Sequence, residues 1–210
     1  MTAKNSYIKN YSSINRNRIL SGGKLLFEQR AASFEKFADA AYTGLHLSYP
    51  KFHKMDRLSK LGFLTAEVLL KDLPLSPRFD SYKVGIVLAN KSSSLDTDLN
   101  YFKSLQQGIA SPAVFVYTLP NIVIGEICIR HKIKGENTFF ISDTYEISSQ
   151  VNYVNTLMNS GAVDACICGW VELMNEEYKS FLYLVEKTEN KNLPDYTAKN
   201  IETVYNEIPT

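Results

Sequence analysis

The sequence is poor in the residues that most often build reactive or cross-linked sites. Its 210 residues include three cysteines, three histidines and one tryptophan. Three cysteines inside apolar runs do not suggest the disulfide framework of a small secreted protein. Cys166 and Cys168 could supply two soft metal ligands, but no further cysteine or suitably spaced histidine completes a site. Strand alternation directs both sulfurs to one face, so we interpret them as core residues and expect neither metal nor cofactor.

An excess of charge of one sign is also lacking. Lysine and arginine number 23 against 22 aspartates and glutamates, which gives a formal net charge of +1. Such a balance produces no global field to attract nucleic acid or an anionic membrane. No apolar run approaches the roughly 20 residues of a membrane helix, and the N-terminal stretch MTAKNSYIKN lacks the apolar core of a signal peptide. We therefore expect a cytoplasmic protein with no membrane span and no nucleic-acid partner.

The chain does have enough apolar residues for a proper core. With 45% hydrophobic and 21% charged residues, it is predicted to be globular. Alternating strand-like and helix-like segments, followed by adjacent final strands, predict a layered α/β fold. Strands are predicted at residues 6–14, 82–90, 137–142, 162–170 and 178–188, and helix-like spacing occurs at residues 24–42, 55–72, 94–107, 119–133 and 148–161. The tail from Asn190 is polar, and we expect it to be peripheral.

One stretch raises a functional question. Residues 135–150, GENTFFISDTYEISSQ, read as a strand that breaks through a short polar kink into a helix. Many α/β enzymes present a nucleophile at such a turn, above helix-terminal N–H groups that can stabilise an oxyanion. This kink offers only Asp143, Thr144 and Tyr145, with no cysteine, no Gly-x-Ser-x-Gly elbow and no histidine beside it.

Several segments taken in order resemble a known family. They are FHKMDRLSKLGFLTAE, VGIVLAN, SPAVFVYTLPNIVIGEICIRHKIKGE, SGAVDACICGW and FLYLVE, spread over about residues 6–188. In this order and spacing they resemble the N-terminal half of a β-ketoacyl synthase, the condensing enzyme of fatty acid and polyketide assembly. A narrower similarity is to short ketosynthase-like proteins encoded with aryl polyene or flexirubin pigment genes. The resemblance implies a thiolase-like N-terminal half over residues 1–189, a layered mixed sheet with helices on its faces, and a polar extension over residues 190–210.

The resemblance also aligns the residues of the kink with the family's nucleophile position. In active members the nucleophilic cysteine follows the glycine of the Lys-Gly segment by nine residues, and counting from Gly135 reaches Thr144. The family's next glycine and aspartate, 17 and 20 residues beyond that position, are matched by Gly161 and Asp164. Thr144, flanked by Asp143 and Tyr145, therefore stands where the resemblance places the catalytic thiol.

Threonine is a poor substitute for that thiol. Its hydroxyl is poorly ionised at neutral pH and needs a base, whereas a thiolate is a good nucleophile. The two histidines of the family belong to its C-terminal half, and His46, His53 and His131 do not match their positions. We interpret these three as ordinary surface or core residues. The chain is thus expected to have no catalytic residue, although residual chemistry on acyl thioesters stays open.

The resemblance further implies a partner. The family dimerises through its N-terminal half, and the side chain four positions beyond the serine of Ser-Pro lines the neighbour's acyl pocket. Candidate interface residues are accordingly Ser111, Pro112, Phe115, Pro120 and Asn121. Phe115 would occupy the pocket position, while the commoner fate of a phenylalanine between valines is to pack in its own core.

An isolated half should leave apolar helix faces in water, which something has to cover. A second copy, a full-length ketosynthase, or the segment 15–50 together with the tail could do so. Three hypotheses follow, in order of preference. The chain is a non-catalytic partner comparable to a chain-length factor, with a full-length ketosynthase or a second copy as partner and an acyl carrier protein as a further candidate. It is a residual acyl-thioester enzyme, or it is a structural pseudoenzyme.

Overall fold

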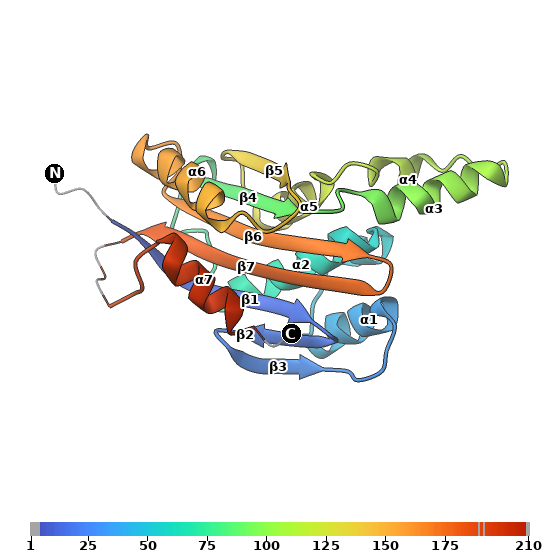
Figure 1. Ribbon diagram of the computed structural model, residues 1–210, viewed down its shortest axis with the longest axis horizontal. Coiled ribbons are helices and arrows are strands. Elements are labelled where there is room, and N and C mark those ends of the chain that lie inside the picture. The colour runs from blue at the N-terminus through green and yellow to red at the C-terminus, as the bar shows by residue number, and fades with distance from the viewer. Residues whose placement is uncertain (1–4, 189, 191, 209–210) are drawn as a thin grey trace.

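The computed structural model describes residues 5–188, 190 and 192–208. A seven-stranded mixed sheet with the strand order β3-β2-β1-β7-β6-β4-β5 forms the middle of three layers (Figure 1). The strands are β1 (Ser6–Asn15), β2 (Arg18–Ser21), β3 (Lys24–Glu28), β4 (Val84–Asn90), β5 (Asn137–Ile141), β6 (Ala165–Met174) and β7 (Glu177–Lys187). The layered α/β prediction is confirmed.

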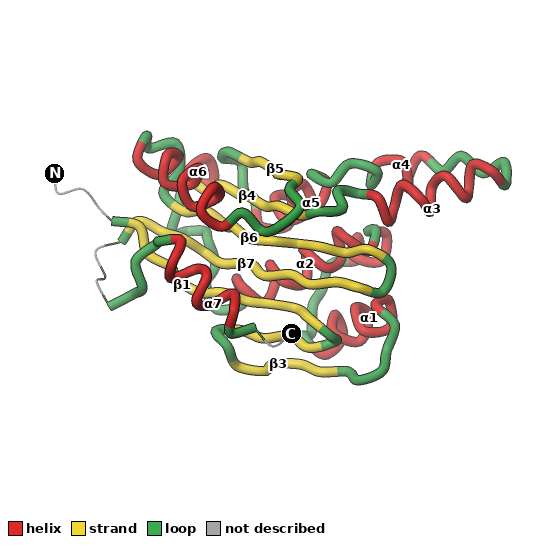
Figure 2. Tube along the Cα trace, viewed as in Figure 1, coloured by secondary structure: helices red, strands yellow, loops and turns green. Residues whose placement is uncertain are grey.

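Helices cover both faces of this sheet. They are α1 (Phe34–Gly44), α2 (Arg57–Leu70), α3 (Leu95–Gln106), α4 (Pro112–Val116), α5 (Ile122–His131), α6 (Ile147–Asn159) and α7 (Ala198–Asn206). Figure 2 shows α6 and α7 on the near face and α1, α2 and α5 on the far face, while α3 and α4 project past the end of the sheet. None of the helices within the described ranges is long and apolar enough to cross a membrane.

The sheet changes character across its width. β4 runs parallel to both β5 and β6, whereas β6, β7, β1, β2 and β3 pair antiparallel in succession. Every residue of β4, VGIVLAN, is buried, as expected for a parallel strand covered on both faces. Gly135 lets the chain pass close to this strand, because a Cβ there would lie 2.4 Å from the Val84 carbonyl oxygen.

Two apolar clusters lie on opposite faces of the sheet. The far cluster is built around α2, whose side chains are buried at nearly every position from Leu58 to Leu70. Asp56 caps that helix, since its carboxylate accepts a hydrogen bond from the Ser59 N–H at 2.9 Å. The near cluster joins α6 and α7 to the inner sides of β4, β6 and β7. The sequence prediction of a helix over residues 55–72 is confirmed.

The helix-like spacing of residues 24–42 is misleading over its first part. Lys24–Glu28 forms strand β3, and helix α1 begins only at Phe34. Gly22 and Gly23 adopt φ values of 54° and 78°, which suits the tight turn that joins β2 to β3. The glycine pair therefore closes a β-hairpin, and the helical reading of residues 24–28 is wrong.

The tail is not peripheral, contrary to the sequence prediction. Its residues Tyr196, Ile201 and Ile208 are buried in the near cluster. The segment before α7 also joins the sheet, because the Tyr196 N–H donates to the Ser6 carbonyl at 3.0 Å and the Ile8 N–H donates to the Pro194 carbonyl at 2.9 Å. The domain boundary at residues 189 and 190 stays a prediction.

Candidate functional site

The predicted kink is present between β5, which ends at Ile141, and α6, which begins at Ile147. Two hydrogen bonds shape it: the Ser142 N–H donates to the Asn90 carbonyl at 3.0 Å, and the Ser142 hydroxyl donates to the Thr144 carbonyl at 2.7 Å. The turn thus leaves the end of the parallel part of the sheet and presents Asp143 and Thr144 to solvent.

Thr144 occupies the tip of this turn. Its side-chain hydroxyl donates a hydrogen bond to the Glu146 carboxylate at 2.8 Å. A carboxylate in this position can accept the hydroxyl proton, but it is a weak base for an alcohol whose own pKa is far higher. The local chemistry is that of a hydrogen-bonded polar turn with no thiol.

Beneath the turn, a buried polar network fills the space between α6 and the sheet. The hydroxyls of Tyr145 and Tyr183 both donate to the Gln150 side-chain oxygen, at 2.6 and 2.9 Å. The Gln150 amide donates in turn to the carbonyls of Val87 and Gly169, at 3.1 and 3.2 Å. Burial raises the pKa of both tyrosines well above the ordinary value, so they act as neutral hydrogen-bond donors.

Sequence reasoning missed Gln150 and Tyr183 because nothing in their local pattern marks them as partners. Gln150 belongs to a helix predicted from its spacing, and Tyr183 belongs to a strand 33 residues away. Only the packing of α6 on the sheet brings them together. The set of candidate residues at the kink therefore gains a buried glutamine whose side chain bonds to four groups.

Helix α7 closes the same site from the solvent side. The Tyr205 ring lies 5.3 Å from the Tyr145 ring and 5.5 Å from the Phe181 ring, measured between centroids. The Lys179 ammonium lies 3.9 Å from the Tyr205 ring centroid, and burial lowers the pKa of that lysine. The tail thus packs directly over the residues that adjoin the kink.

A pocket of about 560 Å³ remains between the kink and α7. Its lining includes Thr144, Glu146, Trp170, Glu202 and Tyr205. No histidine, cysteine, lysine or arginine is among the described residues that line it. The three histidines have other surroundings: His46 lies in a loop, the His53 ring packs on Tyr42, and His131 Nε2 lies 3.0 Å from a Glu67 oxygen.

Three of the five predicted interface residues, Ser111, Pro112 and Phe115, lie on a projecting arm, residues 95–119, that carries α3 and α4. Within the arm, Pro112–Val116 forms a short helix. Ser111 caps it by accepting a hydrogen bond from the Val114 N–H at 3.4 Å, and Pro112 is its first residue, where a missing N–H costs little. Pro120 and Asn121 come just before α5, and the Gly125 N–H donates to the Asn121 carbonyl at 3.1 Å.

Phe115 does not pack in the core of this chain. Its side chain is 60% exposed, and its ring contacts Tyr101 of the same arm at a centroid distance of 5.6 Å. The interpretation of Phe115 as an ordinary core residue is wrong. Its role toward a partner stays a prediction.

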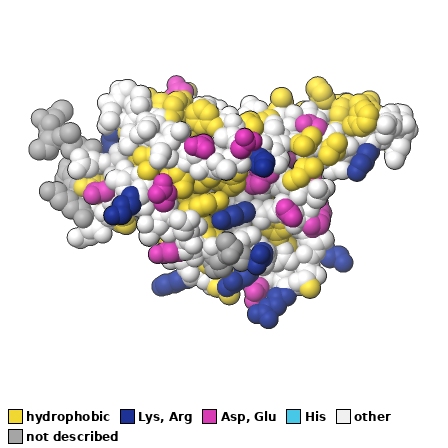
Figure 3. Space-filling model, viewed as in Figure 1, with side chains coloured by type: hydrophobic (Ala, Val, Ile, Leu, Met, Phe, Trp, Pro, Cys, Tyr) yellow, Lys and Arg dark blue, Asp and Glu magenta, His cyan; other side chains and the backbone are white. Residues whose placement is uncertain are grey.

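The arm is unusually apolar on its surface. Nine of the fifteen exposed large hydrophobic side chains in the described part of the chain lie on it: Leu95, Leu99, Phe102, Leu105, Ile109, Val114, Phe115, Val116 and Leu119. Figure 3 shows hydrophobic side chains gathered at this end of the molecule. The edge strand β5 adds the exposed side chains of Phe140 and Ile141. Contiguous apolar surface of this kind marks interaction sites on soluble proteins.

The cysteines behave as the sequence indicated. Cys166 and Cys168 are fully buried, and both belong to the near cluster, which confirms that their sulfurs share one face. Cys128 is partly buried on the far side, and burial raises the pKa of its thiol to about 11. Across residues 5–188, 190 and 192–208, no group of three His, Cys, Asp or Glu side chains is placed to hold a metal ion.

Comparison with known proteins finds similarity only among solved structures. No protein-family model matches the sequence, and no curated protein matches it. Among solved structures, the chain is similar to the ishigamide ketosynthase/chain length factor, with a TM-score of 0.68 and 18% identity over 91% of this chain and 64% of that one. It thus spans less than two thirds of that protein's length.

Two further structures have the same fold. A ketosynthase in complex with its chain length factor from Xenorhabdus doucetiae gives a TM-score of 0.58 with 14% identity, over 89% of this chain and 80% of that one. A β-ketoacyl synthase from Burkholderia phymatum gives a TM-score of 0.58 with 10% identity, over 90% of this chain and 60% of that one. The chain therefore has the thiolase-like fold of the β-ketoacyl synthases.

Proposed function

We propose that the chain is a non-catalytic ketosynthase-like subunit that pairs with a full-length ketosynthase in acyl chain assembly, comparable to a chain-length factor. The observation that carries this proposal is Thr144. It lies at the strand-to-helix kink, where the family resemblance places the nucleophilic cysteine. A condensing enzyme needs a thiol and assisting histidines there, and the residues that line this pocket include neither.

The exposed apolar surface supports a partner. Strand β5 is the last strand of the sheet, so its outer edge is open to another strand. The arm beside it carries apolar side chains that this chain leaves in water. Two of the similar solved structures contain a ketosynthase together with a chain length factor, which favours a ketosynthase as the partner. A second copy of the chain and an acyl carrier protein are further candidates.

Co-purification with the ketosynthases and acyl carrier proteins of the protein's own gene cluster tests the pairing. Because of the resemblance to pigment-cluster proteins, the ketosynthases of aryl polyene and flexirubin clusters are the first partners to test. We propose that the pairing takes place in the cytoplasm. We expect a stable complex, measured by analytical ultracentrifugation at micromolar concentration. A well-behaved monomer in every mixture would contradict the proposal.

A pair of matched variants locates the interface. Phe102→Asp places a charge on the arm, where the side chain is 57% exposed, and we expect it to abolish the complex. Leu25→Asp makes the same change on β3, at the opposite edge of the sheet, where the side chain is 49% exposed. The control variant should bind like the wild type. Equal loss of binding by both variants would point to another surface.

The second candidate function, acyl transfer at the kink, is favoured by the Thr144–Glu146 hydrogen bond alone. Incubation with an acyl-carrier thioester followed by intact mass measurement separates the two proposals. We expect no acyl adduct, and we expect Thr144→Cys to leave condensation absent because the assisting histidines are still missing. A stable acyl mass located at residues 143–145 would establish the transferase instead.

A further inference from the structure

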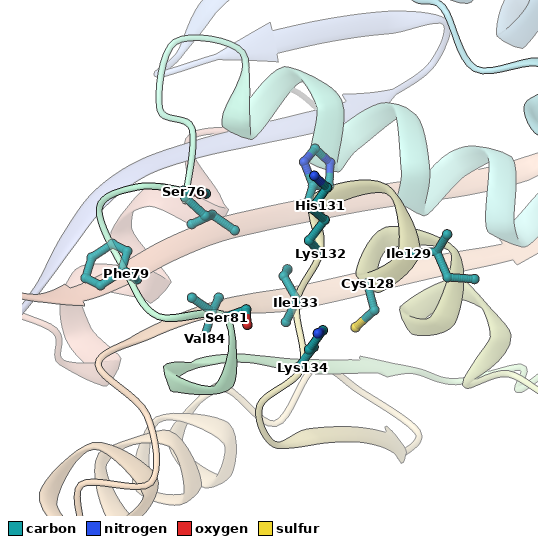
Figure 4. Close-up of a pocket in the computed structure, with 11 residues that line it drawn as sticks. Ser76, Phe79, Ser81, Val84, Cys128, Ile129, His131, Lys132, Ile133 and Lys134 are labelled. Carbon is teal, nitrogen blue, oxygen red and sulfur yellow. The ribbon is translucent and has the colours of Figure 1, made fainter.

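A second cavity lies at the other end of the parallel strands from the kink. Its volume is about 660 Å³, within the range of small-molecule sites. It lies between the loop that precedes β4 and the segment from the end of α5 toward β5 (Figure 4). Because β4 begins at Val84 and the kink follows the far end of β5, this cavity is separate from the pocket at Thr144.

The inner wall of the cavity is apolar. Leu75, Val84 and Ile133 are almost completely buried and contribute their side chains to it, and Phe79 and Cys128 extend the same wall. The apolar surface that the cavity leaves open to solvent comes from Phe79, Cys128 and Ile129, which are partly or largely exposed. An apolar group that covered this surface would gain about 25 cal/mol for each Å² that it buried.

The loop wall is held in place by contacts to the rest of the fold. Arg78 pairs with Glu186, a buried residue on β7, and its guanidinium lies 5.0 Å from the Phe79 ring centroid. The Phe79 N–H donates to the Leu75 carbonyl at 2.9 Å, which closes a turn within the loop. The cavity is therefore bounded on this side by an anchored segment.

Two lysines, Lys132 and Lys134, are among the residues that line the cavity. Lys134 is one of the lining residues (Figure 4), and its ammonium lies 5.3 Å from the ring centroid of the exposed Tyr82. Lys132 follows the last residue of α5, held in the left-handed region with φ 57°. The lining contains no aspartate or glutamate, and within the described residues neither lysine belongs to an ion pair.

The third basic residue of the lining is already engaged. His131 turns toward α2, where its Nε2 lies 3.0 Å from a Glu67 oxygen. Arg130 binds both oxygens of the same carboxylate at 2.9 Å. The Glu67 carboxylate is therefore paired with Arg130 and His131. Lys132 and Lys134 are the lining cations that remain available to a ligand.

We propose that this cavity binds a small carboxylate with an unbranched apolar tail, the tail lying against Phe79, Cys128 and Ile129 and the carboxylate meeting Lys134 or Lys132. An apolar lining with lysines among its residues recognises this amphipathic chemistry, because the tail is removed from water while the anion gains charge-assisted hydrogen bonds. The site does not depend on the proposed function, since none of its residues belongs to the kink or the arm.

Calorimetric titration of the full chain with decanoate, and with decanol as an uncharged probe of the same tail, tests this site. We expect decanoate to bind and the double variant Lys132→Ala with Lys134→Ala to weaken its affinity at least tenfold, while the affinity for decanol stays unchanged. Lys103→Ala, an exposed lysine on α3, is the matched control and should bind decanoate like the wild type.

Chemical labelling of Cys128, which lines the cavity, provides a second readout. Cys128 is the only described cysteine that is not fully buried, so a thiol reagent should label it first, slowly because its pKa is raised. Bound decanoate should slow this labelling severalfold, and Cys128→Leu, which fills the space, should weaken both decanoate and decanol. Failure of decanoate to bind at millimolar concentration, or binding that survives both the lysine and the Cys128 variants, would overturn the proposal.

Discussion

The near face of the sheet and the projecting arm differ in whether the chain covers their apolar side chains. On the near face, α6 turns its apolar side chains inward and exposes polar ones: Ser148, Ser149, Asn152, Thr156 and Asn159. Helix α7 then covers the neighbouring strands (Figure 1). The hydroxyls of Tyr145 and Tyr183 share the side chain of Gln150. The arm instead leaves nine large apolar side chains in water.

This difference indicates where a partner is needed. The resemblance led us to expect that an isolated half would leave its apolar helix faces bare. On the near face that expectation is wrong, since the chain's own tail provides the cover, one of the alternatives that the sequence left open. On the arm and at the edge of β5 it is right. A partner is therefore expected at the arm, while the near face has no need of one.

The largest expected effect comes from removing the tail. A variant that ends at Thr188 would expose the surface now covered by Tyr196, Ile201 and Ile208. At about 1.5–3 kcal/mol for each large apolar side chain, the free energy of unfolding should fall by roughly 5 kcal/mol or more. Urea denaturation of the truncated and full chains measures the loss, and Ile201→Ala should reproduce about 2–5 kcal/mol of it. An unchanged urea midpoint would mean that the tail does not seal this face.

The next effect concerns the polar network under the kink. Gln150→Ala would remove four hydrogen bonds, to the hydroxyls of Tyr145 and Tyr183 and the carbonyls of Val87 and Gly169, and leave the hydroxyls only their longer contacts with one another and with Tyr196. Loss of these bonds inside the fold should cost about 2–4 kcal/mol of unfolding free energy. Gln106→Ala, on the exposed surface of the arm, is the matched control and should change stability by less than about 0.5 kcal/mol. Similar losses in the two variants would erase the contrast between the regions.

Much of the fold could be predicted from the sequence because local patterns dominate it. The helix at residues 55–72 follows from its apolar positions, and the buried strand at residues 82–90 from its β-branched run. The kink also appears where the change from strand to helix predicts it. At residues 24–28 the apolar spacing fitted a helix by coincidence, and the Gly22-Gly23 turn, a hairpin signal, was the better guide.

The candidate site was predictable only in part. Ile201, Val204, Tyr205 and Ile208 follow the i, i+3, i+4, i+7 spacing of an amphipathic helix, so α7 carried a signal within a polar tail. The face of the sheet on which α7 packs could not be predicted from the sequence, because it depends on contacts with β7 and α6, which are distant in sequence. The shared role of Gln150 is of the same long-range kind.

A pH titration sharpens the comparison further. Burial raises the pKa of Tyr145, Tyr183 and Tyr196 above 10.0, so the stability that their neutral forms provide is complete below pH 10.0 and is lost as the pH rises toward their folded values. Urea midpoints should therefore fall steeply in alkali, with tyrosinate absorbance appearing together with unfolding. Tyr183→Phe removes one of these phenols. It should reduce the slope of the unfolding free energy against pH by the contribution of about one proton. Tyrosinate absorbance that rises fully before unfolding would show that the network is open to solvent.

The smallest effect on stability, and the most specific one on function, is expected at Phe115. Because its side chain is 60% exposed and contacts only the arm's own Tyr101 among the described aromatic rings, Phe115→Ala should change the unfolding free energy of the isolated chain by less than about 0.5 kcal/mol. In a reconstituted complex with an active ketosynthase, a bulky ring in the partner's acyl pocket would shorten that pocket by occupancy. The same variant should then shift the products toward longer acyl chains while the complex stays intact, as measured by mass spectrometry of the released chains. Val116→Ala, an exposed neighbour on the same short helix, is the control and should leave product length unchanged. If product length is the same with Phe115 and with alanine while binding persists, Phe115 only completes the surface of the arm, and the partner sets chain length elsewhere.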